Sequence, residues 1–520
     1  MPDKAAAAGY QPYIDALENS VRTGALRWLH QIDLDPASRT YGVADREFWA
    51  WKTRDFINHT WQAGLAGFLD ATPYLELSCE EIRAVVRAVV TGTQRFQRRN
   101  GSFEEAYPWE SSYCVTALVL FSLLAARSRH PEAFPEDSDT GFHTIVRNGL
   151  TFLEATSETH GVIANHLATG YAAIALARQY LNLPLDEDRH WRPFMALQHA
   201  EGWFPEYGGA DPGYQTLLNH YLRVYLACRP SGACPQLRES LERSQRFCAA
   251  FAMPDGGFAG EAGSRGTQIV YPGGLLPLND DPDAMPGWWL SVHQPNIATV
   301  TPVTVEAGNM APVFNSWAFL AVGLKQTRPD FSEVATLLVS DQVFPEAGLW
   351  VFRREHAMAV VSTKQAVIRR VQRVENVWQD ASLTAWVKTE QNNQLTTQGV
   401  PPQDLTVTES SIRWRYAARQ RRQPINTPLR LIALRVIGMV CALLPWLQSP
   451  IKQAMVAFVM GRSEAVQPLP LTMTLDRQDA LLTVVVDPVP PGWRRQPVGF
   501  HQHMASANTL DLRALKDQVL

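Results

Sequence analysis

The stretch EGWFPEYGGADPGY, residues 201–214, joins two helical patterns through a turn that combines glycine, aromatic and acidic residues. Two further stretches have the same character: NGSFEEAYPWE at residues 100–110 and DGGFAGEAGSRG at residues 255–266. Glycine permits the positive φ that reverses a chain, and the aromatic side chain can plug the end of a helical hairpin. Because one style of turn recurs between helices, we expect repeated helix hairpins, which usually close into a ring.

The sequence around these turns has helical periodicity from about residue 10 to residue 327. Apolar residues recur there at spacings of three and four, which is the pattern of an amphipathic helix. The clearest segments are residues 47–71, 79–96, 111–128, 165–182, 213–228 and 239–252. We therefore expect residues 1–327 to form a helical (α/α) toroid, with an irregular helical array as the alternative.

The composition of the chain changes after residue 331. Short runs rich in Val, Thr, Trp and Ile are broken by Gly, Pro and Asn, which is typical of antiparallel sheets. These runs occupy residues 348–371, 382–390, 404–418, 469–477 and 480–489. They predict an antiparallel β-sandwich over residues 328–520.

An apolar segment at residues 427–462 interrupts this second domain, and its pattern is that of a helical hairpin. Its central apolar run, residues 436–447, is too short to span a bilayer, and Pro445 and Pro450 break it. Four basic residues lie within it or at its end: Arg430, Arg435, Lys452 and Arg462. We expect residues 428–461 to contact a membrane surface or a second copy of the chain, with packing on the protein's own sheet as the alternative.

The composition limits the classes of function. A chain of 520 residues is long enough for two domains, and a net charge of −4 argues against a general nucleic-acid binder. The six cysteines lack metal-site spacing or a disulfide framework, and we expect neither metal nor cofactor. The N-terminal sequence lacks the apolar core of a secretory signal. A cytoplasmic protein, peripheral on the inner membrane if the apolar segment binds lipid, fits these features.

A polar pair, Asn165 and His166, opens an otherwise apolar helix in the stretch HGVIANHLATGY, residues 160–171. A helix N-terminus carries partial positive charge, which favours an anionic ligand. Together with SRGTQIVYPGG at residues 264–274 and GLWVFRRE at residues 348–355, this order of features resembles the heparinase II/III-like polysaccharide lyases and their alginate-lyase relatives.

The resemblance implies roles for four residues. Asn165 and His166 would neutralise the carboxylate of a uronic acid, Tyr214 would take and donate protons, and His356 would add an imidazole from the second domain. The β-domain cluster of histidines common in such lyases is absent from this sequence, so no metal ligands carry over. Each residue also has a structural reading: Asn165, for example, is a common helix cap.

The chemistry of β-elimination suggests further candidates. The ordinary pKa of a tyrosine is near 10, so a catalytic Tyr214 would need a neighbour that lowers its pKa, and Arg265 and His220 are candidates. The other expected substrate contacts are Glu105, Tyr107 and Tyr271.

Three functions remain open from the sequence. The first is a lyase-like enzyme that acts on an acidic polysaccharide or glycolipid, in the biosynthesis or processing of a polysaccharide. The second is a glycoside hydrolase that uses ring-face carboxylates such as Glu105, Glu206 and Asp211. The third is a non-catalytic glycan-binding component of a membrane-associated biosynthetic complex.

Overall fold

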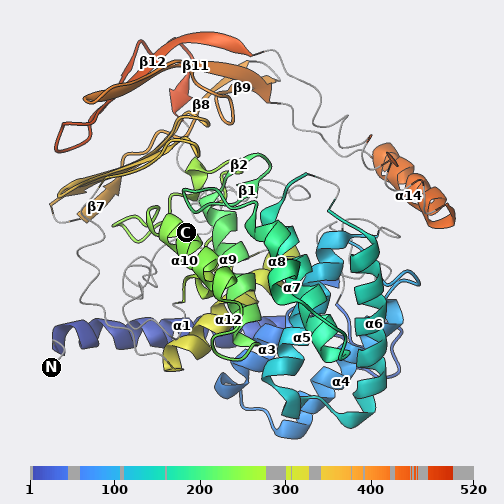
Figure 1. The fold of residues 1–520 in the computed structure, drawn as a ribbon. Coiled ribbons are helices and arrows are strands. Elements are labelled where there is room, and N and C mark those ends of the chain that lie inside the picture. The colour runs from blue at the N-terminus through green and yellow to red at the C-terminus, as the bar shows by residue number, and fades with distance from the viewer. Residues whose placement is uncertain are drawn as a thin grey trace.

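A computed structural model describes most of the chain. The described residues are 4–44, 59–105, 111–158, 161–276, 300–305, 307–326, 341–375, 377–390, 393–421, 428–444, 447, 450–451, 454 and 466–495. Their helices lie mainly in the first part of the sequence and their strands in the second (Figure 1).

The helices of the first part agree closely with the periodicity of the sequence. The segments predicted at residues 79–96, 111–128, 165–182 and 213–228 each form one helix, within three residues at either end. The described helices are α1 (Lys4–Gln31), α2 (His59–Gln62), α3 (Leu65–Ala71), α4 (Cys79–Phe96), α5 (Tyr113–Arg129), α6 (Asp139–Ala155), α7 (Ala164–Tyr180), α8 (Glu187–Met195), α9 (Pro212–Ala227), α10 (Pro235–Ala249) and α12 (Met310–Gln326).

Local side-chain chemistry fixes where several of these helices begin. Ser78 and Glu81 form a reciprocal capping box at the start of α4, which satisfies two backbone N–H groups that the helix leaves unpaired. Ser112 caps α5 by accepting from the N–H of Val115. Asp211 caps α9, where proline at the first helical position supplies a suitable φ.

The helix contacts run in a cycle. α3 contacts α5, α5 contacts α7, α7 contacts α9, α9 contacts α12, and α12 contacts α3. Every residue of α5 from Val115 to Ala126 is buried, which explains why that run is apolar on all sides. α4 and α10 bury only one face, and their sequences are correspondingly amphipathic.

The described strands in the second part of the chain form two antiparallel sheets. The first sheet has the order β3 (Gln342–Phe344), β4 (Leu349–Arg354), β5 (Ala357–Ser362), β6 (Val367–Val374) and β7 (Val377–Asp380). The second has the order β13 (Val484–Asp487), β12 (Gln467–Asp476), β11 (Ser411–Arg421), β9 (Asn393–Thr396), β8 (Trp386–Glu390) and β14 (Arg494–Arg495), with β10 (Gln403–Val407) also paired to β11.

The central strands of the first sheet, β4 to β6, are largely buried on both faces because the sheet lies between the helices and the second sheet (Figure 1). Alternate residues of β5 belong to different cores: Met358 and Val360 to the core of the helical region, Ala359 and Val361 to a core that includes Trp414 of the second sheet. Side chains alternate between the two faces of a strand, so β5 must be apolar throughout. Its sequence, AMAVVS, is buried at every position.

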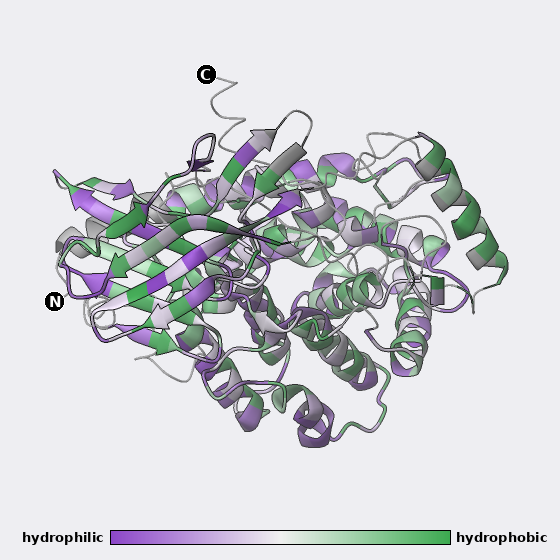
Figure 2. Cartoon of the chain, turned by 90° about the horizontal axis from the view of Figure 1, so that it is seen from above, coloured by the Kyte–Doolittle hydropathy of each residue, from purple (hydrophilic) through white to green (hydrophobic). Residues whose placement is uncertain are grey.

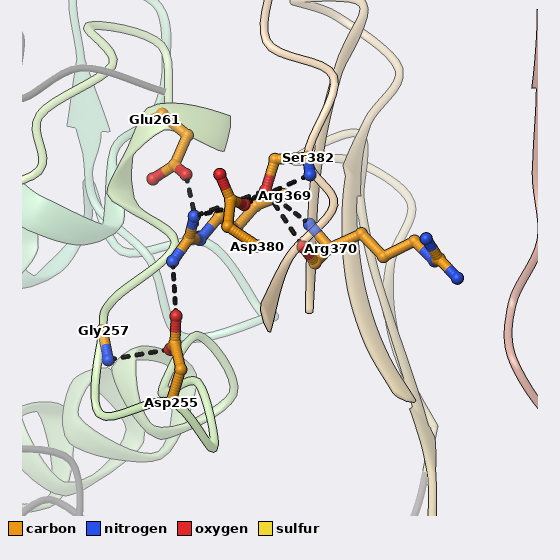
Figure 3. Close-up of polar contacts among 7 residues, drawn as sticks. All are labelled: Asp255, Gly257, Glu261, Arg369, Arg370, Asp380 and Ser382. Carbon is orange, nitrogen blue, oxygen red and sulfur yellow. Dashed lines mark hydrogen bonds and ion pairs between the residues drawn. The ribbon is translucent and has the colours of Figure 1, made fainter. Parts of the chain in front are cut away.

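Arg369, on β6, ties the first sheet to the helical region (Figure 3). Its guanidinium lies 2.7 Å from the Asp255 carboxylate and 3.4 Å from Glu261, both in the turn that follows α10. It also lies 2.9 Å from Asp380 on β7, so one cation joins carboxylates from both regions. Phe344 of β3 adds ring contacts with Phe247 and Phe251.

A helical region followed by antiparallel sheets is therefore confirmed. α12 ends at Gln326 and β3 begins at Gln342, and the expected domain boundary at 327/328 lies outside the described residues. The expected apolar insertion begins with a helix, α14 (Pro428–Leu443), while most of its second half lies outside the described residues. In the described part of the chain, no helix combines the length and the apolar character needed to cross a membrane.

Candidate functional site

The recurring turns have the conformation that the sequence suggests. Gly101 and Gly202 have φ of +88° and +98°, and the aromatic residues that follow them, Phe103 and Phe204, are buried. The turn after Gly202 continues into a small hairpin, β1 (Pro205–Glu206) and β2 (Gly209–Ala210). This hairpin carries the centre of the candidate site.

The hairpin lies against the entry to α7. Glu206 forms a β-bridge with Ile163, and the backbone N–H of Tyr207 donates to the carbonyl of Val162. Tyr207 and Gly208 both have positive φ, as a tight two-residue hairpin turn requires. The hairpin between α8 and α9 thus contacts the residues that lead into α7.

Asn165, Glu206 and Arg265 are joined directly. The Asn165 side-chain amide donates to one oxygen of the Glu206 carboxylate at 2.9 Å, and the Arg265 guanidinium donates to the other at 3.0 Å. Glu206 is 3% exposed. Asn165 is not the cap of α7, whose N-cap is Ile163, so its amide serves this contact instead of the helix end.

Arg265 also contacts two aromatic rings. Its guanidinium carbon lies 4.3 Å from the centre of the Tyr214 ring and 4.7 Å from that of Tyr207. Asp211 aligns these residues, because its carboxylate accepts from the backbone N–H groups of Tyr214 and Arg265 at 2.9 and 2.8 Å. Tyr207 is 37% exposed, so the cluster reaches the surface at this ring.

His166 lies on the other side of Asn165. Its Nδ1 is 2.7 Å from the Glu158 carboxylate, and its ring also hydrogen-bonds the thiol of Cys114 at the start of α5. Burial opposes the charged imidazolium, but these interactions with Cys114 and Glu158 outweigh it and raise the pKa of His166 well above its usual value. The direction of this shift favours the protonated imidazole, which lies beside the Glu158 carboxylate.

Burial dominates the ionisation of Glu206 and Tyr214, two of the groups that contact Arg265. It raises the pKa of Glu206, although Arg265 and His166 act in the opposite direction. It also raises the pKa of Tyr214, again against the pull of Arg265. Arg265 thus lowers the pKa of Tyr214 as expected, but desolvation outweighs this cation and the net shift is upward.

His220 is not part of this cluster. It lies on α9 near Arg129 and Asp70, with its ring against Phe319, and burial together with Arg129 lowers its pKa to about 3. Asp70 there accepts two hydrogen bonds from Arg129, so this is a separate buried ion pair. The described interactions of His220 are therefore with this ion pair and with Phe319, and the six residues between His220 and Tyr214 turn their side chains to different sides of the helix.

The remaining predicted residues are dispersed. Glu105 accepts from the Ser112 hydroxyl at 2.7 Å and lies near Cys114, on the His166 side of the cluster. Tyr271 is buried, and its backbone N–H donates to Thr216 of α9. His356 lies in the exposed turn between β4 and β5, beside Glu355, and the structure does not bring it to Tyr214. Tyr107 lies outside the described residues.

The sequence did not single out Glu158, Cys114 or Tyr207, and it suggested Glu206 only as a hydrolase carboxylate. Glu158 lies in the connection that precedes α7, eight residues before His166, so a search of that connection for an imidazole partner would have found it. Tyr207 precedes two glycines, which marks a tight turn. Cys114 gives no signal in the sequence, because only packing brings α5 to α7.

No group of three or more His, Cys, Asp or Glu side chains within the described ranges is arranged to hold a metal ion. The sequence matches no known protein family and no curated protein.

Proposed function

We propose that this chain is a divergent heparinase II/III-like enzyme, which abstracts the α-proton of a uronic acid and cleaves the sugar chain by β-elimination. In this proposal the cycle of helices is an (α/α) toroid and the two sheets form the β-sandwich of the superfamily. The supporting observation is the convergence of an amide, a guanidinium, a carboxyl and a phenol from three separate segments: Asn165, Arg265, Glu206 and Tyr214.

The first requirement of the reaction is to hold the substrate carboxylate. Asn165 and Arg265 already donate hydrogen bonds to a carboxylate, that of Glu206, and the imidazole of His166 lies close enough to influence its ionisation. A uronate that shares these donors would have its charge partly neutralised, which acidifies the neighbouring C–H. Carboxylates elsewhere in the cluster are balanced by their own partners, Glu158 by His166 and Asp211 by backbone N–H groups.

The second requirement is a base and an acid. The raised pKa of Glu206 makes its carboxylate a stronger base than an ordinary glutamate, and it takes the α-proton. The electron pair of that C–H bond forms the new double bond, and the bond to the leaving oxygen breaks. Tyr214, whose raised pKa keeps it protonated, donates its proton to that oxygen. The resemblance alone would give both proton transfers to the tyrosine, so the division of roles is specific to this chain.

A glycoside hydrolase is the second candidate. Its support is again Glu206, since a buried carboxyl with a raised pKa is the usual general acid of such enzymes. Asp211 is a weak choice for the second carboxylate, because both of its oxygens accept backbone hydrogen bonds that fix the start of α9.

Product analysis with uronic-acid oligosaccharides tests the proposal. The purified chain should generate unsaturated, ultraviolet-absorbing ends, and Glu206→Gln and Tyr214→Phe should each lower the rate at least a hundredfold. Glu154→Gln and Tyr180→Phe make the same chemical changes outside the cluster and should retain activity. If the products instead have saturated reducing ends, the reaction is hydrolysis and the elimination proposal is wrong. Glycan binding without turnover would reduce the chain to a binding component.

A further inference from the structure

α14 presents an apolar surface that a protein exposed only to water would not be expected to keep. Figure 1 shows it at the periphery of the molecule, apart from the helical region and both sheets, and Figure 2 shows its hydrophobic character from a second direction. Leu429 and Leu443, near its two ends, are 77% and 81% exposed. The other exposed apolar side chains of α14 and the residue after it are Ile432, Val436, Ile437, Met439, Val440 and Leu444.

These side chains share one face. At 100° per residue they fall within an arc of about 160°, which is the width of the apolar face of an interfacial helix. The sequence of α14 also contains two arginines, Arg430 and Arg435, and no acidic residue. An exposed apolar face of this width suits the boundary between acyl chains and headgroups.

The charge of the surrounding sequence indicates what covers this face. Between Arg421, the last residue of β11, and Glu464 the chain has five Arg and Lys residues and no Asp or Glu, a charge of +5. The net charge of the whole chain is −4, so the rest of the chain carries −9. Two copies that paired through α14 would bring two such cationic segments together, whereas an anionic lipid surface would attract one.

The length of α14 determines its orientation. Sixteen residues span about 24 Å, which is less than the roughly 30 Å of a bilayer core. A helix of this length satisfies its own backbone and buries its apolar face by lying in the plane of the interface.

We propose that α14 docks this protein onto an anionic phospholipid membrane, with its apolar face inserted at the level of the headgroups. This proposal uses only the exposed apolar side chains of α14, its length and the charge of the surrounding sequence. It holds whether or not the catalytic proposal is correct.

Flotation of the full-length protein with vesicles tests it. The protein should float with vesicles of phosphatidylcholine and phosphatidylglycerol, and much less with phosphatidylcholine alone or at high salt. The triple variant Ile432→Ser, Val436→Ser, Leu443→Ser should lower the partition coefficient by at least about tenfold, because each inserted side chain loses apolar burial. A matched triple variant at exposed apolar positions of the sheets, Val377→Ser, Val407→Ser, Val485→Ser, should bind as the parent does.

The same variants distinguish membrane binding from self-association, in which a second copy of the chain would cover the apolar face of α14. If the parent does not float, or if both triple variants bind equally well, the membrane proposal is wrong. A parent that is dimeric in light scattering and becomes monomeric only in the α14 variant, with no vesicle binding, would assign the face to self-association.

Discussion

Replacement of Arg369 by methionine should loosen the junction between the helical region and the first sheet. The Arg369 side chain is 6% exposed, and its guanidinium joins Asp255 and Glu261 on one side to Asp380 on the other (Figure 3). Methionine retains much of the apolar stem but removes the charge. The carboxylates then lose their shared cation.

The expected loss in the free energy of unfolding depends on which carboxylate stays buried after Arg369 is replaced. The side chains of Asp255 and Asp380 are 20% and 30% exposed and can be hydrated, whereas that of Glu261 is 7% exposed. Breaking a buried ion pair costs about 3–5 kcal/mol. We expect about 3 kcal/mol, the low end, because the guanidinium lies 3.4 Å from Glu261, longer than a good charged hydrogen bond.

Urea unfolding followed by tryptophan fluorescence measures this loss, and its pH dependence identifies Glu261. Burial raises the pKa of Glu261 even with Arg369 in place, so the folded state favours the neutral carboxyl. Without Arg369 the pKa rises further. The deficit of the variant should therefore be full at neutral pH and shrink as the pH falls through the raised pKa. Adding Glu261→Gln to Arg369→Met should recover part of the stability at neutral pH.

Arg370 provides the matched control. It is the next residue of β6, and its guanidinium points away from the junction to the carbonyl of Leu481 and the amide of Gln372 (Figure 3). Arg370→Met removes hydrogen bonds to neutral partners and should cost about 1 kcal/mol. If Arg369→Met costs no more than Arg370→Met, or if its deficit does not change with pH, the ion cluster does not stabilise the junction.

Three further predictions concern the candidate site. Because Glu206 must be ionised to act as a base and burial raises its pKa, the elimination rate should fall as the pH drops through a value above the ordinary 4.3 of a glutamate; a pH profile flat down to 4.3 would contradict this. Glu158→Gln should lower the pKa of His166, since the carboxylate holds the proton on the ring, and an NMR titration of the histidine measures the shift; an unchanged value would assign the effect to Cys114 alone. Asp211→Ala should lower the free energy of unfolding by about 1–2 kcal/mol and Asp211→Asn by less, because asparagine still caps α9; equal losses would show that the cap is unimportant.

The helical periodicity and the turn residues of the sequence by themselves predict much of the fold. Periodicity placed the cores of α4, α5, α7 and α9, and the short runs rich in Val, Thr, Trp and Ile placed the antiparallel sheets. These features are local, because the period of the apolar residues reports which face of each element is buried. The same local reading found Asn165 and Arg265, since a polar pair at a helix start and an arginine in a glycine turn are visible in sequence.

Tertiary structure alone decided how those residues are used. Glu206 lies 41 residues from Asn165 and 59 from Arg265, and no pattern in the sequence shows that one carboxylate joins them. Likewise, only packing places His220 beside Arg129 instead of Tyr214, and only burial raises the pKa of Tyr214 where the nearby cation alone would lower it. The physical reason is that desolvation and charge pairing depend on what surrounds a group in space, which periodicity along the chain does not encode.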